Sequence, residues 1–317
     1  MTTTLPFAPQ LTQQHMLALK DYSTTEILDL LQLAAQLKKP EHKYQPLLAG
    51  KVLGMIFEKS STRTRVSFEA GMLQLGGHAI YLNSQDTQIG RGETTADTAR
   101  VLSGYLDGLM IRTFHQATVQ ELADNSSIPV INGLTDDFHP CQVLADLLTV
   151  QEHFGTIAGK KMAYIGDANN MSNSLMIGAA KVGMDFTLAA PAAYAPKPEF
   201  VAIAQDIAKA TGANIHVTTD PVEAVQNSDA IYTDVWASMG QEAETLERME
   251  HFKGFQVNEE LVQHAKDDFI FMHCLPAHRE EEVSTAVLEG PHSVIFQQSE
   301  NRLHAQKALL VALMGNN

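Results

Sequence analysis

The sequence predicts an α/β protein made of two doubly wound parallel-sheet domains joined by long helices. Short apolar runs typical of buried strands alternate with segments whose apolar residues recur at helical spacing. At 317 residues the chain is longer than one hydrophobic core usually organises. The alternation restarts after a polar, glycine-containing stretch at 155–161, so the chain divides into two halves of similar length and pattern.

In the first half, a capping-box pattern at 23–26 predicts a helix to about residue 39, where Pro40 stops it. Strands are expected at 52–57, 79–82, 108–112 and 130–131. Helices are expected from the 60–69 stretch to about 75, at 96–105 and at 119–123, with a loop rich in Gly, Gln and Thr at 83–93. A long connecting helix opens at 137–142 and ends at Gly155.

In the second half, strands are expected at 162–165, 186–189, 214–217, 230–233 and 269–272. Helices are expected near 175–181, 199–209, 222 and 259–265, with a final helix at 301–314. Strands that alternate with helices in this way form parallel sheets covered on both faces.

Composition narrows the classes of function. A net charge of −15 argues against a nucleic-acid or anionic-membrane partner, because both need an excess of Lys and Arg on one face. No run approaches the roughly 20 apolar residues of a membrane span, and residues 1–10 lack a secretory pattern, so a cytoplasmic protein is expected. Cys141 and Cys274 are too far apart to suggest a disulfide framework or a paired-cysteine zinc site.

No cofactor or metal is expected. The segment Gly166-Asp167-Ala168 follows a strand, but the second and third glycines of a dinucleotide fingerprint are absent. The thirteen histidines show no metal-protease spacing.

The stretch Ser60-Ser61-Thr62-Arg63-Thr64-Arg65 predicts an anion site between a strand and a helix. Ser60 or Ser61 is placed to accept from the free N–H groups of the first helical turn. Arg63 and Arg65 stand where a helix carries partial positive charge, and each is disfavoured there by a few tenths of a kcal/mol unless an anion balances it. A bound phosphate resolves this conflict through the backbone N–H groups, the hydroxyls and a guanidinium. The alternative is an ordinary helix cap followed by two solvated arginines.

Ligands of parallel sheets bind outside the carboxyl ends of the strands, so the residues found there are candidates. In the first half they include Arg112 and the turn 139–142, and in the second half the segments 166–170, 234–239 and 273–276. His273 and Cys274 suggest a thiol–imidazole pair, but neighbours on a strand point to opposite faces. A buried, inert cysteine is the alternative.

Two further candidates have plain structural alternatives. Asp234 at a strand end is also the kind of residue that caps a turn. Arg302, expected in the opening turn of the last helix, repeats the conflict of a cation with the helix dipole and is placed to bind a phosphate or the neighbouring Glu300.

Four segments together resemble the signatures of ornithine carbamoyltransferases, in that family's order and spacing across essentially the whole chain. They are Ser61-Thr62-Arg63-Thr64-Arg65, His139-Pro140-x-Gln142, Asp234-Val235-Trp236-x-Ser238-Met239-Gly240 and His273-Cys274-Leu275-Pro276. The first two are shared with aspartate carbamoyltransferases and indicate carbamoyl phosphate. The last two belong to the ornithine branch and indicate the acceptor.

The resemblance implies a role for each matching position. Residues 1–150 with the helix at about 301–317 would bind carbamoyl phosphate, and residues 151–300 would bind L-ornithine. The carbamoyl phosphate residues would be Ser61, Thr62, Arg63, Thr64, Gln88, Arg112, His139, Gln142 and Arg302, with Gln88 reaching a neighbouring subunit of a homotrimer or multiple of trimers. The ornithine residues would be Asn170, Asp234, Ser238, Met239, Cys274 and Leu275.

The implied reaction is attack by the ornithine side-chain amine on the carbamoyl carbon, giving L-citrulline and phosphate in arginine metabolism. The catalytic residues would be Arg112, His139, Asp234 and Cys274, and the loop after Met239 would act as a lid hinged at Gly240. One alternative is a transferase for another amine acceptor, putrescine or an acylated ornithine. Another is a phosphate-binding regulator without activity.

Overall fold

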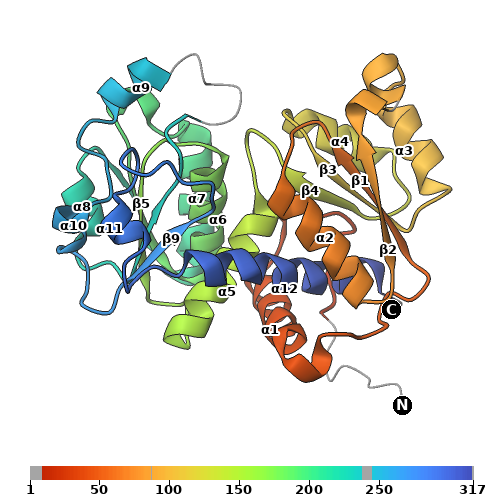
Figure 1. Ribbon diagram of the computed structural model, residues 1–317, viewed down its shortest axis with the longest axis horizontal. Helices are drawn as coiled ribbons and strands as arrows, with labels where there is room; N and C mark the ends of the chain where they lie inside the picture. Colours follow the sequence, from red (N-terminus) through yellow and green to blue (C-terminus); the bar gives the residue numbers. More distant parts are fainter. Residues whose placement is uncertain (1–8, 87, 238–244, 316–317) are drawn as a thin grey trace. The chain divides into compact units, whose positions relative to one another are not determined.

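The computed structural model describes residues 9–86, 88–237 and 245–315, which form two compact units. Unit 1 holds the described residues up to Leu148 and from Glu300 onward, and unit 2 holds those from Thr149 to Ser299. Two long helices, α5 (Pro140–Phe154) and α12 (Ile295–Met314), each run from one unit into the other (Figure 1). The predicted fold class is confirmed.

Unit 1 contains a parallel sheet of β1 (Val52–Phe57), β2 (His78–Asn83), β3 (Gly108–Arg112) and β4 (Val130–Leu134), in the order β2-β1-β3-β4. Its helices are α1 (Thr24–Lys38), α2 (Thr62–Gln74), α3 (Thr95–Ser103) and α4 (Gln116–Asp124), with short 3₁₀ helices η1 (Leu19–Asp21), η2 (Pro40–His42), η3 (Ser84–Asp86) and η4 (Gln88–Arg91). Apolar residues of β1 and β3 pack under α3 and α4. The strand order reverses between β1 and β3, and this switch point is where such sheets bind ligands.

Unit 2 contains a second parallel sheet of β5 (Lys161–Ile165), β6 (Asp185–Ala189), β7 (Ile215–Thr218), β8 (Ala230–Thr233) and β9 (Ile270–His273), in the order β7-β6-β5-β8-β9. Its helices are α6 (Asn170–Val182), α7 (Pro198–Thr211), α8 (Pro221–Val225), α9 (Thr245–His251), α10 (Glu259–Val262) and α11 (Thr285–Leu288), with η5 (Ala192–Tyr194). The switch point lies between β5 and β8.

The predicted strands are confirmed to within a few residues, and the capping box at Ser23 and Glu26 is present. Three differences concern helices. Helix α6 begins at Asn170, five residues before the prediction, because its first turns bury polar residues and show no apolar stripe. Helix α12 begins at Ile295 instead of residue 301, because its buried face carries Gln298 and Asn301 and hides the periodicity. The short helices α9 and α11 were not predicted.

Among the described residues, no helix is both long enough and apolar enough to cross a membrane.

Candidate active site

The first helical turn after β1 carries the predicted anion-site residues. Ser61 caps α2, and its side chain accepts a hydrogen bond from the Thr64 N–H at 3.2 Å. Arg65 donates from Nε to Glu69 at 2.9 Å and lies over the Tyr81 ring at 3.8 Å. A carboxylate of its own helix therefore balances Arg65, and the argument for an anion rests on Arg63, which is partly buried in the same turn.

A buried arginine joins three segments of unit 1 that are distant in sequence. Arg302 on α12 donates from Nη1 to Gln142 Oε1 at 2.7 Å and from Nη2 to Thr64 Oγ1 at 3.1 Å. All three side chains are buried, and Gln142 also donates from Nε2 to Asp146 Oδ1 at 2.8 Å. The structure thus brings together three of the predicted carbamoyl phosphate residues.

The predicted place of Arg302 in its helix was wrong. It is not in the opening turn of the last helix but in the third turn of α12, which begins at Ile295. The charge at a helix end falls off within the first turn, so the dipole does not act on Arg302. Its side chain reaches Gln142 and Thr64 instead.

Arg112 adds a further positive charge to this surrounding, and His139 lies within it. Arg112 is the buried last residue of β3, and His139 lies buried immediately before α5. Burial, followed by the charges of Arg302, Arg112 and Arg63, holds the pKa of His139 well below its usual value. His139 is therefore neutral at physiological pH, and a neutral imidazole can still donate a hydrogen bond to a carbonyl oxygen.

Thr62 and Gln88 differ from the other predicted residues of unit 1. Thr62 is exposed at the first position of α2. Gln88 is exposed in η4, and its backbone carbonyl accepts from the Glu93 N–H at 3.2 Å. The predicted contact of Gln88 with a neighbouring subunit stays a prediction.

Unit 2 gathers an amide, a carboxylate and a thiol just after the carboxyl ends of β5, β8 and β9. Asp234 follows β8, and its Oδ2 accepts from Asn169 Nδ2 at 2.9 Å. Its Oδ1 accepts from the Cys274 thiol at 3.1 Å and from the Val235 N–H at 2.9 Å. Asp234 is therefore a hydrogen-bonded member of a network and not only a turn cap.

Asn169 is a residue of this network that the sequence did not single out. Its Oδ1 caps α6 by accepting from the N–H groups of Met171 and Ser172 at 2.9 and 3.3 Å, while its Nδ2 is directed to Asp234. The predicted residue, Asn170, is the first residue of α6 and is partly buried. The polar run Asn169-Asn170 contained the signal, but only the cap geometry separates the two.

Neighbouring strand residues point to opposite faces, and His273 and Cys274 accordingly have different hydrogen-bond partners instead of forming a thiol–imidazole pair. The His273 ring meets Glu282 Oε1 at 3.1 Å through Nε2 and accepts the Leu275 N–H at 2.9 Å through Nδ1. Cys274 is half-buried and bonded to Asp234, which does not fit the buried, inert alternative. Leu275, also partly buried, has a positive φ of 59° and is held by the His273 ring.

Donor atoms of Asp234, His273 and Cys274 lie within 4.8 Å of one another, a spacing that a metal ion can bridge. Both ring nitrogens of His273 already have hydrogen-bond partners, so binding a metal would break one of these bonds. The geometry favours a hydrogen-bond network over a metal centre.

A buried ion pair in unit 2 supports the turns that follow β5 and β8. Arg248 on α9 donates from Nη1 to Asp167 Oδ2 and to the Trp236 carbonyl, each at 2.8 Å. Burial raises the pKa of the Asp167 carboxyl, and the charge of Arg248 opposes that rise. The sequence could not indicate this pair, because its members lie 81 residues apart.

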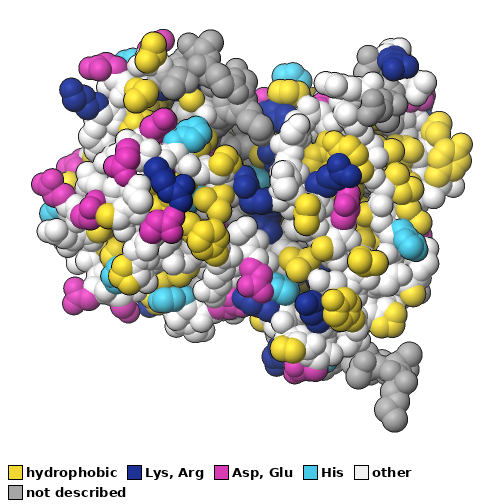
Figure 2. All heavy atoms as spheres, viewed as in Figure 1, with side chains coloured by type: hydrophobic (Ala, Val, Ile, Leu, Met, Phe, Trp, Pro, Cys, Tyr) yellow, Lys and Arg dark blue, Asp and Glu magenta, His cyan; other side chains and the backbone are white. Residues whose placement is uncertain are grey.

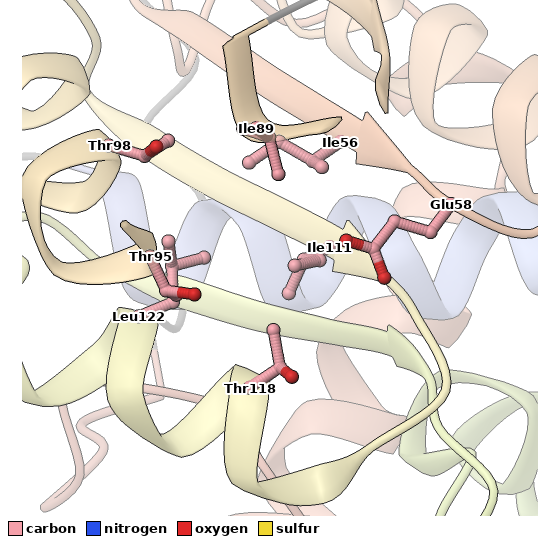
Figure 3. Close-up of a pocket in the computed structure, with 8 residues that line it drawn as sticks. All are labelled: Ile56, Glu58, Ile89, Thr95, Thr98, Ile111, Thr118 and Leu122. Atoms are coloured by element: carbon pink, nitrogen blue, oxygen red, sulfur yellow. The ribbon is translucent and has the colours of Figure 1, made fainter. Parts of the chain in front are cut away.

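Unit 1 contains a small cavity whose lining includes none of the predicted site residues. It has a volume of about 10 Å³ and lies against β1, β3, α3 and α4 (Figure 3). Its lining consists of Ile56, Glu58, Ile89, Thr95, Thr98, Ile111, Thr118 and Leu122. Such a space holds about one water molecule, so it is too small for a phosphorylated substrate.

Ser238, Met239 and the expected hinge Gly240 lie outside the described residues.

Both halves of the chain match one family. Residues 14–152 match the carbamoyl-P binding domain of aspartate/ornithine carbamoyltransferases, and residues 158–313 match the Asp/Orn binding domain. The chain belongs to the ornithine carbamoyltransferase family. It is 61% identical to the ornithine carbamoyltransferase of Anoxybacillus flavithermus, with 99% of each chain covered. It is 57% identical to that of Bacillus cereus, over 97% of this chain and 96% of the relative.

Solved structures agree with the family assignment. The ornithine carbamoyltransferase of Pyrococcus furiosus superposes with a TM-score of 0.93 at 51% identity, over 99% of this chain and 100% of the other. The enzyme of Gloeobacter violaceus gives 0.87 at 48%, over 96% and 99%. As a member of this family, the protein is an enzyme, a carbamoyl-group transferase.

Proposed function

We propose that the protein transfers the carbamoyl group of carbamoyl phosphate to the side-chain amine of L-ornithine, giving L-citrulline and phosphate in the arginine metabolism of the cytoplasm. The observation that carries the proposal is that each unit gathers polar groups of different chemistry near the carboxyl ends of its sheet. One gathers guanidinium, imidazole and hydroxyl groups, and the other gathers a carboxylate, an amide and a thiol. The names of the relatives support the same reaction.

Residues 1–150 with the helix at 301–317 bind carbamoyl phosphate in this proposal. Its phosphate lies at the start of α2, where Ser61, Thr62, Arg63 and Thr64 supply N–H, hydroxyl and guanidinium donors. The charge that Arg63, Arg112 and Arg302 exert on His139 supports an anion at this place. Arg112 and the neutral His139 donate to the carbonyl oxygen, and Gln142 holds the carbamoyl nitrogen.

Residues 151–300 bind ornithine. Asn170, Ser238 and Met239 hold the amino-acid part, while Asp234, Cys274 and Leu275 surround the reacting amine. The hydrogen bond between the Cys274 thiol and Asp234 supports this arrangement, since it places an acceptor beside a group that can relay a proton.

In the reaction, the amine nitrogen forms a bond to the carbamoyl carbon, and a tetrahedral intermediate with a negative oxygen results. The bond from that carbon to the phosphate oxygen then breaks, and phosphate leaves with the electron pair. The amine loses two protons overall, one before attack and one as citrulline forms, directly or by relay through Cys274 and Asp234. Because an alkylammonium of pKa about 10.4 is almost wholly protonated at pH 7, the site must offset roughly 4–5 kcal/mol.

The active form in this proposal is a homotrimer or a multiple of trimers. Val66 and Leu73 lie seven residues apart on α2 with 55% and 71% of their surfaces exposed, and Ile80 on the neighbouring β2 is 46% exposed. Figure 2 shows hydrophobic side chains gathered on the side of unit 1 where these elements lie. An exposed apolar face of this kind supports contact with another subunit, in which Gln88 would reach the neighbouring substrate.

The test is citrulline formation from carbamoyl phosphate with ornithine, run beside putrescine, N-acetylornithine and aspartate at neutral and alkaline pH. Turnover with ornithine alone, rising as its amine deprotonates, is the expected result. Turnover with putrescine or an acylated ornithine would support the alternative acceptor and overturn the assignment of unit 2. Binding of carbamoyl phosphate without turnover would overturn the whole proposal.

A further inference from the structure

We propose that Asp146 is a positioning residue that fixes the orientation of the Gln142 side-chain amide, and that this orientation makes the site select a carbamoyl group over an acyl group of the same shape. The inference rests on the proposed function, in which Gln142 holds the carbamoyl nitrogen.

Asp146 and Gln142 lie one turn apart on α5 and are buried, with 0% and 2% of their surfaces exposed. The amide nitrogen of Gln142 donates to Asp146 Oδ1 at 2.8 Å. On its other side, the amide oxygen accepts from Arg302 Nη1 at 2.7 Å. The amide is thus held between an acid and a guanidinium.

The chemistry of these two neighbours leaves the amide one favourable orientation. A guanidinium has only donors, and a carboxylate has only acceptors. The reverse orientation would face the Gln142 NH₂ with the Arg302 N–H groups and its oxygen with the Asp146 carboxylate. Both contacts would be repulsive in a buried site, where an unmade hydrogen bond is costly.

This orientation gives the site an acceptor where the substrate's nitrogen is expected. The Gln142 oxygen has two lone pairs, of which Arg302 takes one, and the second can accept an N–H of the carbamoyl group. Acetyl phosphate has the same shape but carries a methyl group there. A site built to hydrogen-bond an NH₂ rejects such an analogue, because the buried oxygen is left without its bond.

The experiment compares two constants in each variant: KM for carbamoyl phosphate and the inhibition constant of acetyl phosphate as its competitor. Asp146→Leu keeps the number of side-chain heavy atoms but removes the hydrogen-bond acceptor. It should lower the ratio of the acetyl phosphate inhibition constant to the carbamoyl phosphate KM by about tenfold. Asp146→Asn should keep the ratio within about twofold of the unchanged enzyme, because the Asn oxygen can accept the same hydrogen bond. If Asp146→Leu does not fold, Asp146→Ser replaces it, since its side chain is too short to reach Gln142.

Asp107→Leu is the control for Asp146→Leu. Asp107 is another carboxylate of unit 1 that accepts hydrogen bonds, from the Val52 backbone N–H at 2.9 Å and from Lys51 Nζ at 3.1 Å, but it lies at the amino end of β3. Removing this carboxylate should lower the melting temperature and leave the ratio unchanged.

A ratio that stays constant in Asp146→Leu, with or without a lower melting temperature, would show a purely structural role and overturn the inference. Equal loss of discrimination in Asp146→Asn and Asp146→Leu would overturn the orientation argument as well. Failure of the unchanged protein to form citrulline would instead refute the proposed function, so the two failures are distinguishable.

Discussion

Two glutamines of α12 are expected to respond in opposite ways to the same substitution. Gln298 and Gln306 are both fully buried. Gln298 accepts from the His273 N–H at 2.9 Å and donates to the Tyr232 hydroxyl at 3.1 Å. Among the described residues, neither side-chain polar atom of Gln306 has a hydrogen-bond partner.

The magnitudes follow from this difference. A buried polar group without a partner costs about 1–3 kcal/mol, and methionine is close to glutamine in size, so any strain should stay below about 1.5 kcal/mol. Gln306→Met should therefore raise the free energy of unfolding by about 1–2 kcal/mol. Gln298→Met breaks two hydrogen bonds and leaves the buried His273 N–H unpaired, and it should lower the free energy of unfolding by about 2–3 kcal/mol.

Melting temperatures measured at one protein concentration check both signs, since assembly makes the midpoint depend on concentration. Each kcal/mol should move the midpoint by about 2–4 °C for units of this size. Hydrogen exchange at the His273 amide should be faster in Gln298→Met and unchanged in Gln306→Met. If Gln306→Met destabilised the protein as much as Gln298→Met, the cost assigned to unpaired amides would be refuted for this helix.

Three further predictions concern charged residues. Burial alone would raise the pKa of Glu26, but hydrogen bonds from Thr12 and Ser23 lower it to about 2. The contribution of the ionised Glu26 to the free energy of unfolding should therefore be lost as the pH falls from about 4.5 toward 2. Glu26→Gln should remove this part of the pH dependence, measured by urea unfolding. Burial lowers the pKa of Lys307 to about 8, so above that pH the unfolded chain binds more protons than the folded protein. The free energy of unfolding should therefore rise by up to about 3 kcal/mol between pH 8 and 10.5. Lys307→Met should abolish this rise in the same urea unfolding assay. Arg248→Met leaves the buried Asp167 carboxylate without its cation. The KM for ornithine should rise by about tenfold, while the KM for carbamoyl phosphate should stay within about twofold. Equal changes in the two KM values would contradict a local effect in unit 2.

Much of the fold could be predicted from local pattern. Strands β1, β3 and β8 are mainly apolar runs buried on two faces, and such runs stand out in a sequence. The capping box at Ser23 is equally local. Helix α12 was harder, because a buried face that carries Gln298, Asn301 and Arg302 does not show apolar periodicity.

The candidate site divides along the same line. The turn at 61–64 was predictable because an N-cap and a cation in the first turn are features of adjacent residues. The hydrogen bonds of Arg302 could not be predicted in this way, since its partners Gln142 and Thr64 are 160 and 238 residues away in the chain. The dipole argument selected Arg302 for a reason that the structure shows to be wrong, and its inclusion among the carbamoyl phosphate residues rests on the resemblance to the family.

In unit 2 the separation of the network's residues follows from the sheet topology, whereas Arg302 meets Gln142 and Thr64 because the end of α12 belongs to unit 1. At a switch point the two neighbouring strands are far apart in sequence, because the chain completes one side of the sheet before it starts the other. Groups at their ends therefore come from separate segments, as Asn169 after β5 and Asp234 after β8 do in unit 2. Such a residue can also stabilise its own segment. Asn169, for example, caps α6 through its side-chain oxygen and donates to Asp234 through its side-chain nitrogen. A substitution that removes only one of these contacts, such as Asn169→Asp, which retains the capping oxygen but places a second carboxylate beside Asp234, should impair the acceptor site and preserve the helix.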